Sequence, residues 1–179
     1  GGGVANVYAD SPVAEYIHQV VFRPLRRDPG PVRMVPSLNV SYKSACIDQV
    51  GFFDETIPQA GGEDVDHCWR VTAAGWEVRY QPDLVVSHHY PTTYRALVRQ
   101  ARMYGRGFCQ SRHRQPDLPG SDFVSMPWWR AVAGTAPHVA REAIRTATEV
   151  DVAAVPASIL REAMFRAAAL AERKRLATP

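Results

Sequence analysis

The chain has 179 residues, a formal net charge of +3, a hydrophobic fraction of 46% and a mean hydropathy of −0.24. This balance is typical of a globular domain and excludes a disordered chain, and the small net charge gives no reason to expect a nucleic-acid partner. No apolar run approaches the roughly 20 residues that a membrane-spanning helix needs. Because Cys46, Cys68 and Cys109 are far apart and lack metal-ligand spacing, we expect reduced thiols in a cytoplasmic protein.

Short elements are predicted in the first sixty residues. Apolar positions near one face predict a helix over residues 13–22, and a proline-broken polar loop follows at residues 24–31. Residues 33–42 have a strand-like pattern. Ser44 is the expected N-cap of a short helix that ends before Gly51.

A helix and two strands are predicted over residues 63–89. The helix starts after Gly61-Gly62, stops at Gly75 and turns four residues inward: Val65, Cys68, Trp69 and Thr72. Residues 76–80 alternate as a half-buried strand, and residues 84–86 form a buried strand that delivers His88 and His89 at its end. Trp69 is expected in the core, with stacking on a ligand as the alternative.

The second half of the chain is predicted to be helical. One helix runs from Thr92 or Thr93 to Tyr104 and is closed by Gly105 and Gly107. A linker and helices around residues 128–129, 138–150 and 157–175 follow. The face of the first helix opposite its apolar stripe carries four arginines: Arg95, Arg99, Arg102 and Arg106, with Arg112 and Arg114 beyond. These are either a solvated surface or a contact for phosphate, from a lipid-diphosphate acceptor or from membrane headgroups.

The cluster Glu63-Asp64-Val65-Asp66 lies where a glycine-rich loop enters a helix. The helix dipole and free backbone N–H groups favour an ionised carboxylate there, which is what a general base for a hydroxyl nucleophile requires. A helix-capping acid without chemistry is the alternative.

His88 ends a buried strand, where a neutral imidazole would be rigidly held and able to bind a divalent metal. Strand alternation turns His89 the other way. A hydrogen-bonded structural histidine is the alternative.

The run from Pro36 to Gly107 resembles the C-terminal part of the family 2 glycosyltransferases of the GT-A fold. The matching segments, in order, are Asn39-x-Ser41-Tyr42-Lys43, Gly51-Phe52-Phe53-Asp54-Glu55, Gly62-Glu63-Asp64-Val65-Asp66, Trp69-Arg70, Ala74-Gly75-Trp76, Tyr80-x-Pro82 and Val85-Val86-x-His88. The resemblance implies that Asp64 is the catalytic base of an inverting sugar transfer and that Glu63 and Asp66 orient the acceptor. It also implies a nucleotide-sugar donor and a Mg²⁺ or Mn²⁺ ion, with His88 as one ligand.

The resemblance covers only the acceptor side of such an enzyme. Residues before Pro36 contain no Asp-x-Asp, and the chain begins Gly1-Gly2-Gly3-Val4 without a starting Met or signal peptide. We therefore expect an α/β chain that is the C-terminal half of a GT-A (Rossmann-like) domain, part of a longer protein and inactive by itself. The expected division is a partial GT-A domain over residues 1–110, a linker over 111–122 and a helical extension over 123–179.

The expected setting is bacterial cell-envelope glycan or glycolipid synthesis in the cytoplasm, with peripheral contact at the inner face of the plasma membrane through the four arginines. Sugar addition to a peptide-derived redox cofactor stays open. Two other functions also stay open. One is a non-catalytic fragment that binds an acceptor or assembles with a partner. The other is a metallohydrolase built from Asp64, Asp66, His67, His88 and His89.

Overall fold

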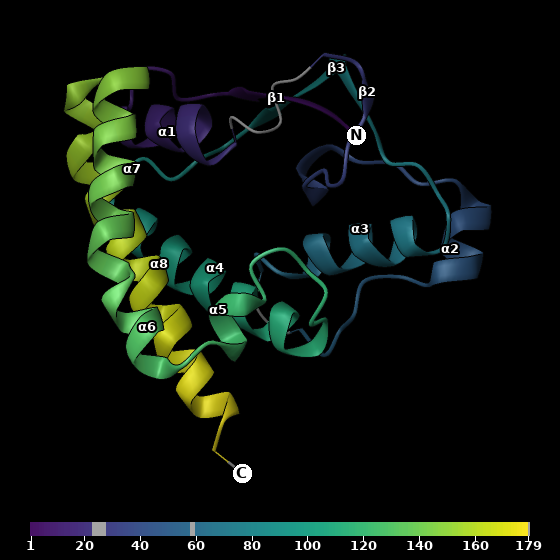
Figure 1. Ribbon diagram of the computed structural model, residues 1–179. Coiled ribbons are helices and arrows are strands. Elements are labelled where there is room, and N and C mark those ends of the chain that lie inside the picture. The colour runs from purple at the N-terminus through teal and green to yellow at the C-terminus, as the bar shows by residue number, and fades with distance from the viewer. Residues whose placement is uncertain (23–27, 58–59, 179) are drawn as a thin grey trace.

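The computed structural model describes residues 1–22, 28–57 and 60–178, which form a mixed α/β structure. A small sheet lies across one end of the molecule, and two long helices run side by side along another side (Figure 1). The α/β class predicted from the sequence is thereby confirmed.

The sheet has the strand order β1-β3-β2 among the described residues. Strand β1 (Gly2–Asn6) is parallel to β3 (Arg79–His88), and β2 (Gly30–Pro31) is antiparallel to it. The sequence did not predict β1, because glycine is a poor strand former. Here glycine is needed: a Cβ on Gly2 would lie 2.0 Å from the carbonyl oxygen of Leu84. Strand β2 forms the last two residues of the loop predicted at residues 24–31, and residues 24–27 of that loop lie outside the described residues.

The strand predicted over residues 33–42 is wrong. This segment instead contains the 3₁₀ turn η3 (Ser37–Asn39), which follows Pro36. Proline cannot donate a backbone hydrogen bond to a strand ladder. The side chain of Asn39 connects this segment to the sheet instead. The Asn39 Nδ2 atom donates to the carbonyl oxygens of Gly3 at 2.8 Å and Leu84 at 2.7 Å and so ties the segment to β1 and β3.

The two short helices predicted in this part of the chain are confirmed. Helix α1 (Pro12–Tyr16) continues as the π-helical turn η1 (Ile17–Val21). Helix α2 (Ser44–Val50) ends at Gly51, whose φ of 80° suits glycine. Ser44 is its first helical residue, and the N-cap is Lys43.

Helix α3 (Glu63–Ala73) is present as predicted, but a different face of the helix is buried from the one that the sequence predicted. Of the four residues expected to face inward, only Cys68 is buried. Asp66, His67 and Val71 are buried instead, because the polar pair makes the contacts to the turn after α2 that are described below. The predicted Leu84–Val86 strand and the last two residues of the predicted Trp76–Tyr80 strand belong to one strand, β3, whereas residues 76–78 are not in a strand. Leu84 and Val85 are 60% and 57% exposed rather than buried.

Helix α4 (Tyr94–Arg114) begins at the predicted place, where the Thr93 hydroxyl caps the N–H of Ala96 at 3.2 Å. Its predicted end at Gly105 and Gly107 is wrong, since the helix continues for several residues past both. These glycines allow close packing instead of stopping the helix. A Cβ on Gly105 would lie 2.2 Å from the carbonyl oxygen of Phe165 in helix α8 (Val155–Leu176).

The remaining helices are α5 (Asp122–Ser125), α6 (Trp128–Ala133), α7 (Thr135–Glu149) and the 3₁₀ turn η4 (Val152–Ala154) before α8. Helix α8 packs most extensively on α4 and also along α7. The predicted linker over residues 111–122 thus begins inside α4, and the division into domains stays a prediction. Among the described residues, no helix is both long and apolar enough to cross a membrane.

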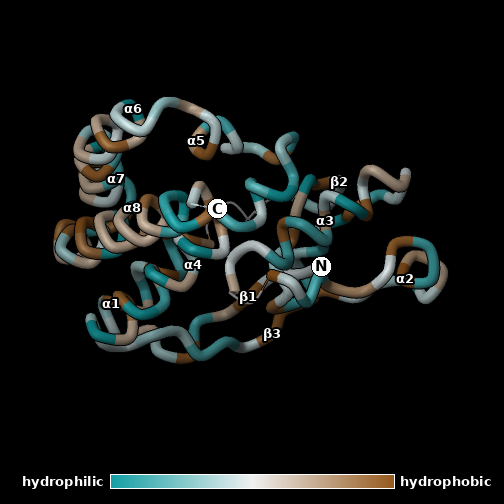
Figure 2. The backbone as a smooth tube through the Cα atoms, turned by 90° about the horizontal axis from the view of Figure 1, so that it is seen from below, coloured by the Kyte–Doolittle hydropathy of each residue, from teal (hydrophilic) through white to brown (hydrophobic). Residues whose placement is uncertain are grey.

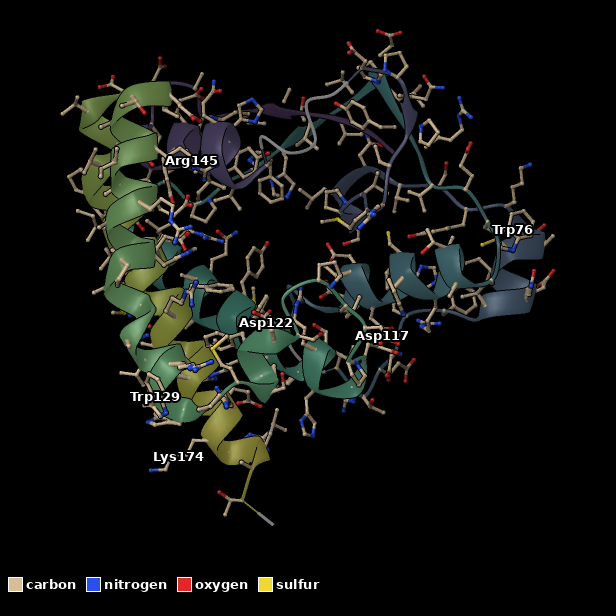
Figure 3. The ribbon with its side chains drawn as sticks, viewed as in Figure 1. Trp76, Asp117, Asp122, Trp129, Arg145 and Lys174 are labelled. Carbon is tan, nitrogen blue, oxygen red and sulfur yellow. The ribbon has the colours of Figure 1, made fainter. Side chains whose placement is uncertain are left out.

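The described residues form three buried hydrophobic clusters, of which one joins Phe123 of α5, Ala131 of α6 and Ala169 of α8. The other two lie toward opposite ends of the molecule. One cluster joins α1 and η1 to Leu97 of α4 and Ala157 of α8, and another joins α2 and α3 to Val35 and Val78. Figure 2 shows the same grouping, with α1, α4, α7 and α8 at one end and α2, α3 and β2 toward the other. Trp76, which donates to Gln49 of α2 at 2.9 Å, and Trp129 of α6 lie at these opposite ends (Figure 3).

Candidate active site at the start of helix α3

Two glycines press the start of α3 against the middle of α4. Gly61 has a φ of 97°, and a Cβ there would lie 2.7 Å from the Tyr104 ring. A Cβ on Gly62 would lie 2.3 Å from the carbonyl oxygen of Gly107. Only glycine fits both positions, so the first turn of α3 has a fixed place beside α4.

Glu63 holds this glycine loop in shape. Its Oε2 atom accepts from the N–H groups of Gly61 at 2.7 Å and Gly62 at 3.0 Å. One carboxylate oxygen is therefore committed to the backbone before any acceptor binds.

Asp64 is half-buried in the first turn of α3, and its Oδ1 atom accepts from the N–H of Val65 at 2.8 Å. Burial raises the pKa of this carboxyl, and the charge of Glu63 raises it further. The N–H groups of Val65 and Ser37 act in the opposite direction but do not outweigh burial. The sequence predicted that the helix terminus would favour the ionised form, whereas burial makes Asp64 a stronger proton acceptor than an ordinary aspartate.

Two side chains of α4 next to Asp64 were missed in the sequence. Burial raises the pKa of Tyr104, and so do the charges of Asp64 and Glu63. Burial lowers the pKa of Arg112 to about 10, although the negative charge of Asp64 acts to raise it. The sequence did not place either residue beside Asp64, because Tyr104 was the predicted last residue of the helix and Arg112 was grouped with the basic surface beyond it. A helix continued past Gly105 brings later residues back to the same face.

Arg112 does not belong to the exposed basic surface with which the sequence grouped it. Its Nε atom donates to the carbonyl oxygen of Pro119 at 3.0 Å, and its guanidinium lies 4.0 Å from the centre of the Phe108 ring. The side chain is thereby turned toward the loop after α4.

Asp66 faces away from this site. It is 1% exposed, and its Oδ2 atom lies 2.9 Å from Nε of Arg70. Arg70 also donates to the carbonyl oxygens of Val50 and Phe52, and His67 Nε2 lies 3.0 Å from that of Gly51. The acceptor-binding role predicted for Asp66 finds no support in this position, because its carboxylate holds the turn after α2.

His88 ends β3 opposite Asn6 of β1. Burial lowers the pKa of its imidazole, and the neighbouring His89 adds to the effect. The Nδ1 atom is buried and has no hydrogen-bond partner among the described residues. His89 is exposed and its Nδ1 lies 2.9 Å from the Tyr8 hydroxyl, so the two rings have different neighbours.

A metal site is not assembled around His88 within the described part of the chain. No group of three or more His, Cys, Asp or Glu residues there is arranged to hold a metal ion. The neutral, partnerless Nδ1 of His88 fits a single ligand position.

A pocket of about 270 Å³ adjoins Asp64 through its neighbour Val65. Trp69 and Thr72 of α3 form one wall, and Leu118 and Pro119 of the loop after α4 form another. Figure 3 places Asp117 of that loop next to α3. Trp69 therefore lines a pocket rather than the core, and the mainly apolar lining suits a ligand with an apolar part.

The model of the Glycosyl transferase family group 2 matches residues 4–168. The chain belongs to this family. That match extends from β1 into α8 and includes every residue of the candidate site, and it confirms the resemblance stated from the sequence.

Two curated relatives carry the printed name pre-mycofactocin glycosyltransferase and come from two strains of Mycobacterium tuberculosis. Each is 36% identical to this chain over 142 residues, which is 74% of the chain and 30% of the relative. The chain thus spans under a third of the length of these relatives. No solved structure matches the chain.

Proposed function

We propose that this chain is the acceptor side of an inverting glycosyltransferase of the GT-A type, with Asp64 as the general base. One observation carries the proposal: a half-buried carboxyl with a raised pKa lies at the start of α3, where two glycines fix it against α4. A base must be held in position and must accept a proton readily, and Asp64 meets both requirements.

In the proposed reaction an acceptor hydroxyl attacks the anomeric carbon of a nucleotide-sugar. The new bond joins the acceptor oxygen to that carbon, the bond to the diphosphate oxygen breaks, and the hydroxyl proton passes to Asp64. Attack from the side opposite the leaving group inverts the anomeric configuration. Glu63 is the second proposed acceptor contact, through the carboxylate oxygen that does not bind the glycine loop.

A divalent metal, Mg²⁺ or Mn²⁺, is the proposed cofactor, and it would neutralise the charge that develops on the departing diphosphate. His88 is the ligand that the described residues offer, because its Nδ1 atom is buried without a partner and its imidazole stays neutral. A Mn²⁺ titration of a His88→Ala variant checks this assignment against His89→Ala, and equal metal affinities in the two would contradict it.

The acceptor is proposed at the level of class. The sequence alone indicated cell-envelope glycan or glycolipid synthesis, and the printed name of the relatives adds a pre-mycofactocin-like acceptor.

We place the reaction at the inner face of the plasma membrane, with peripheral contact through Arg95, Arg99, Arg102 and Arg106. A non-catalytic acceptor-binding fragment is the second candidate, and the small three-stranded sheet of the described residues favours it. The metallohydrolase is not retained, because Asp66 and His67 hold the turn after α2.

The test is Asp64→Asn in the longer protein that contains this chain. We expect kcat to fall by about 10²–10⁴-fold while the fold is kept. A raised carboxyl pKa means that ionised Asp64 lowers stability at neutral pH, so the neutral amide should not lower the melting temperature. The acid limb of the wild-type rate profile should lie above the pH expected for an ordinary aspartate. A kcat within about threefold of wild type would remove Asp64 from the mechanism.

A further inference from the structure

A groove of about 650 Å³ runs along the exposed side of α4. Arg95, Arg99, Arg102 and Arg106 all line it and are all exposed. With a rise of about 1.5 Å per residue, the Cα atoms of the first and last arginine are about 16 Å apart along the helix. This row of charge is too long for a single phosphate or diphosphate to satisfy.

The four guanidinium groups have few partners of their own. Among the described residues none forms an ion pair with a carboxylate, and Arg102 makes only a weak contact with the Met164 sulfur at 3.7 Å. Glu172 is close enough for Arg106 to lower its pKa, but its Oε1 atom already accepts from Gln110 and Arg175. The positive charge in the groove is thus available to an external anion.

The floor of the groove is apolar. Val98 and Met103 of α4 and Leu160 of α8 line it, and α8 crosses α4 at this place (Figure 1). Tyr94, which is 45% exposed, also lines the groove. Arginine beside exposed aliphatic and aromatic groups is the pattern of a surface that lies in the interface of a lipid bilayer.

The groove is separate from the candidate active site. Tyr104 and Gly107 of α4 lie against the start of α3, and neither of them lines the groove. At 100° per residue, the four arginines lie about 140–180° around the helix from Tyr104 and about 80–140° from Gly107. A ligand in the groove therefore does not occupy the place of the acceptor beside Asp64.

We propose that this groove binds the phosphate headgroups of anionic phospholipids and docks the chain on a membrane surface. The inference rests on the peripheral location proposed above but is independent of the transfer chemistry. The length of the arginine row and its apolar floor favour a bilayer surface over free phosphate. Each arginine near such a surface contributes about fivefold to binding at physiological salt.

The experiment measures co-sedimentation of the 179-residue chain with vesicles. We expect binding to vesicles of phosphatidylglycerol and phosphatidylcholine, loss of binding as salt rises, and little binding to phosphatidylcholine alone. Arg99→Gln with Arg102→Gln should weaken binding by about twentyfold or more. Leu160→Asn should weaken it without changing its salt dependence, because it removes only apolar contact.

The matched control is Arg130→Gln with Arg141→Gln, which removes two exposed arginines from α6 and α7. It should change vesicle binding by less than about threefold, and both double variants should keep the wild-type melting temperature. Equal loss in the control would overturn the proposal in favour of net charge alone. Displacement from the vesicles by millimolar pyrophosphate would overturn it in favour of a soluble phosphate ligand. Because no sugar transfer is measured, failure here leaves the role of Asp64 to its own test.

Discussion

Asp64 and Asp66 are two residues apart and have opposite environments. Asp64 lies beside α4 with a raised pKa, and Asp66 is buried against Arg70. The motif Gly62-Glu63-Asp64-Val65-Asp66 pointed to this turn, but not to which of its carboxylates lies beside α4. That depends on the rotation of α3, which is set by contacts to residues 50–52 that lie far away in the sequence.

Asp66→Asn tests this division of roles. Loss of the carboxylate leaves Arg70 partly buried without its ion pair, so the free energy of unfolding should fall by about 1–3 kcal/mol. Urea denaturation of the 179-residue chain measures it. Asp48→Asn on the exposed side of α2 is the control and should stay within about 0.5 kcal/mol of wild type. A similar loss in both variants would show that the Asp66–Arg70 pair is not what holds the turn.

At the scale of elements, local patterns predicted most of the helix boundaries but not the end of α4. The starts of α3 and α4 were predicted correctly because a glycine pair and Thr93 mark them. The end of α4 was predicted at Gly105, because the sequence alone does not distinguish a glycine that stops a helix from one that permits close packing. Strand β1 was missed for a related reason. Its glycines are required by the close approach of β3, which lies about eighty residues away in the sequence. Only the tertiary contact distinguishes the two uses of glycine.

Gly105→Ala tests the packing role. The added Cβ would meet the Phe165 carbonyl at 2.2 Å, so α4 and α8 must separate, at a cost of about 1–3 kcal/mol in the free energy of unfolding. Gly134→Ala, between α6 and α7, is the matched control, because its nearest neighbour is 3.3 Å away. We expect it to stay within about 1 kcal/mol of wild type. If the α4–α8 contact did not require glycine at this position, Gly105→Ala would instead stabilise the chain, because alanine is the better helix former.

At the scale of the whole molecule, the described residues hold a candidate base and one candidate metal ligand but only three strands. We therefore expect no saturable binding of a sugar nucleotide to the 179-residue chain in titration calorimetry. A longer protein that includes the rest of the length seen in the relatives should bind and turn over the donor. Saturable binding by the 179-residue chain would mean that the small sheet already forms a donor site.

The positions of side chains around α4 limit which membrane-anchored acceptors could reach Asp64. The arginine groove and the contacts to α3 occupy different sides of one helix, and a helix with its side chains is about 10–12 Å across. If the groove rests on a bilayer, the turn that carries Asp64 lies at another side of α4, about 80–180° around the helix from the four arginines. An acceptor anchored in that bilayer would need a spacer long enough to pass around the helix before its hydroxyl met the base. An acceptor dissolved in the cytoplasm would meet no such requirement, so docking through this groove would itself select against short lipid-linked acceptors.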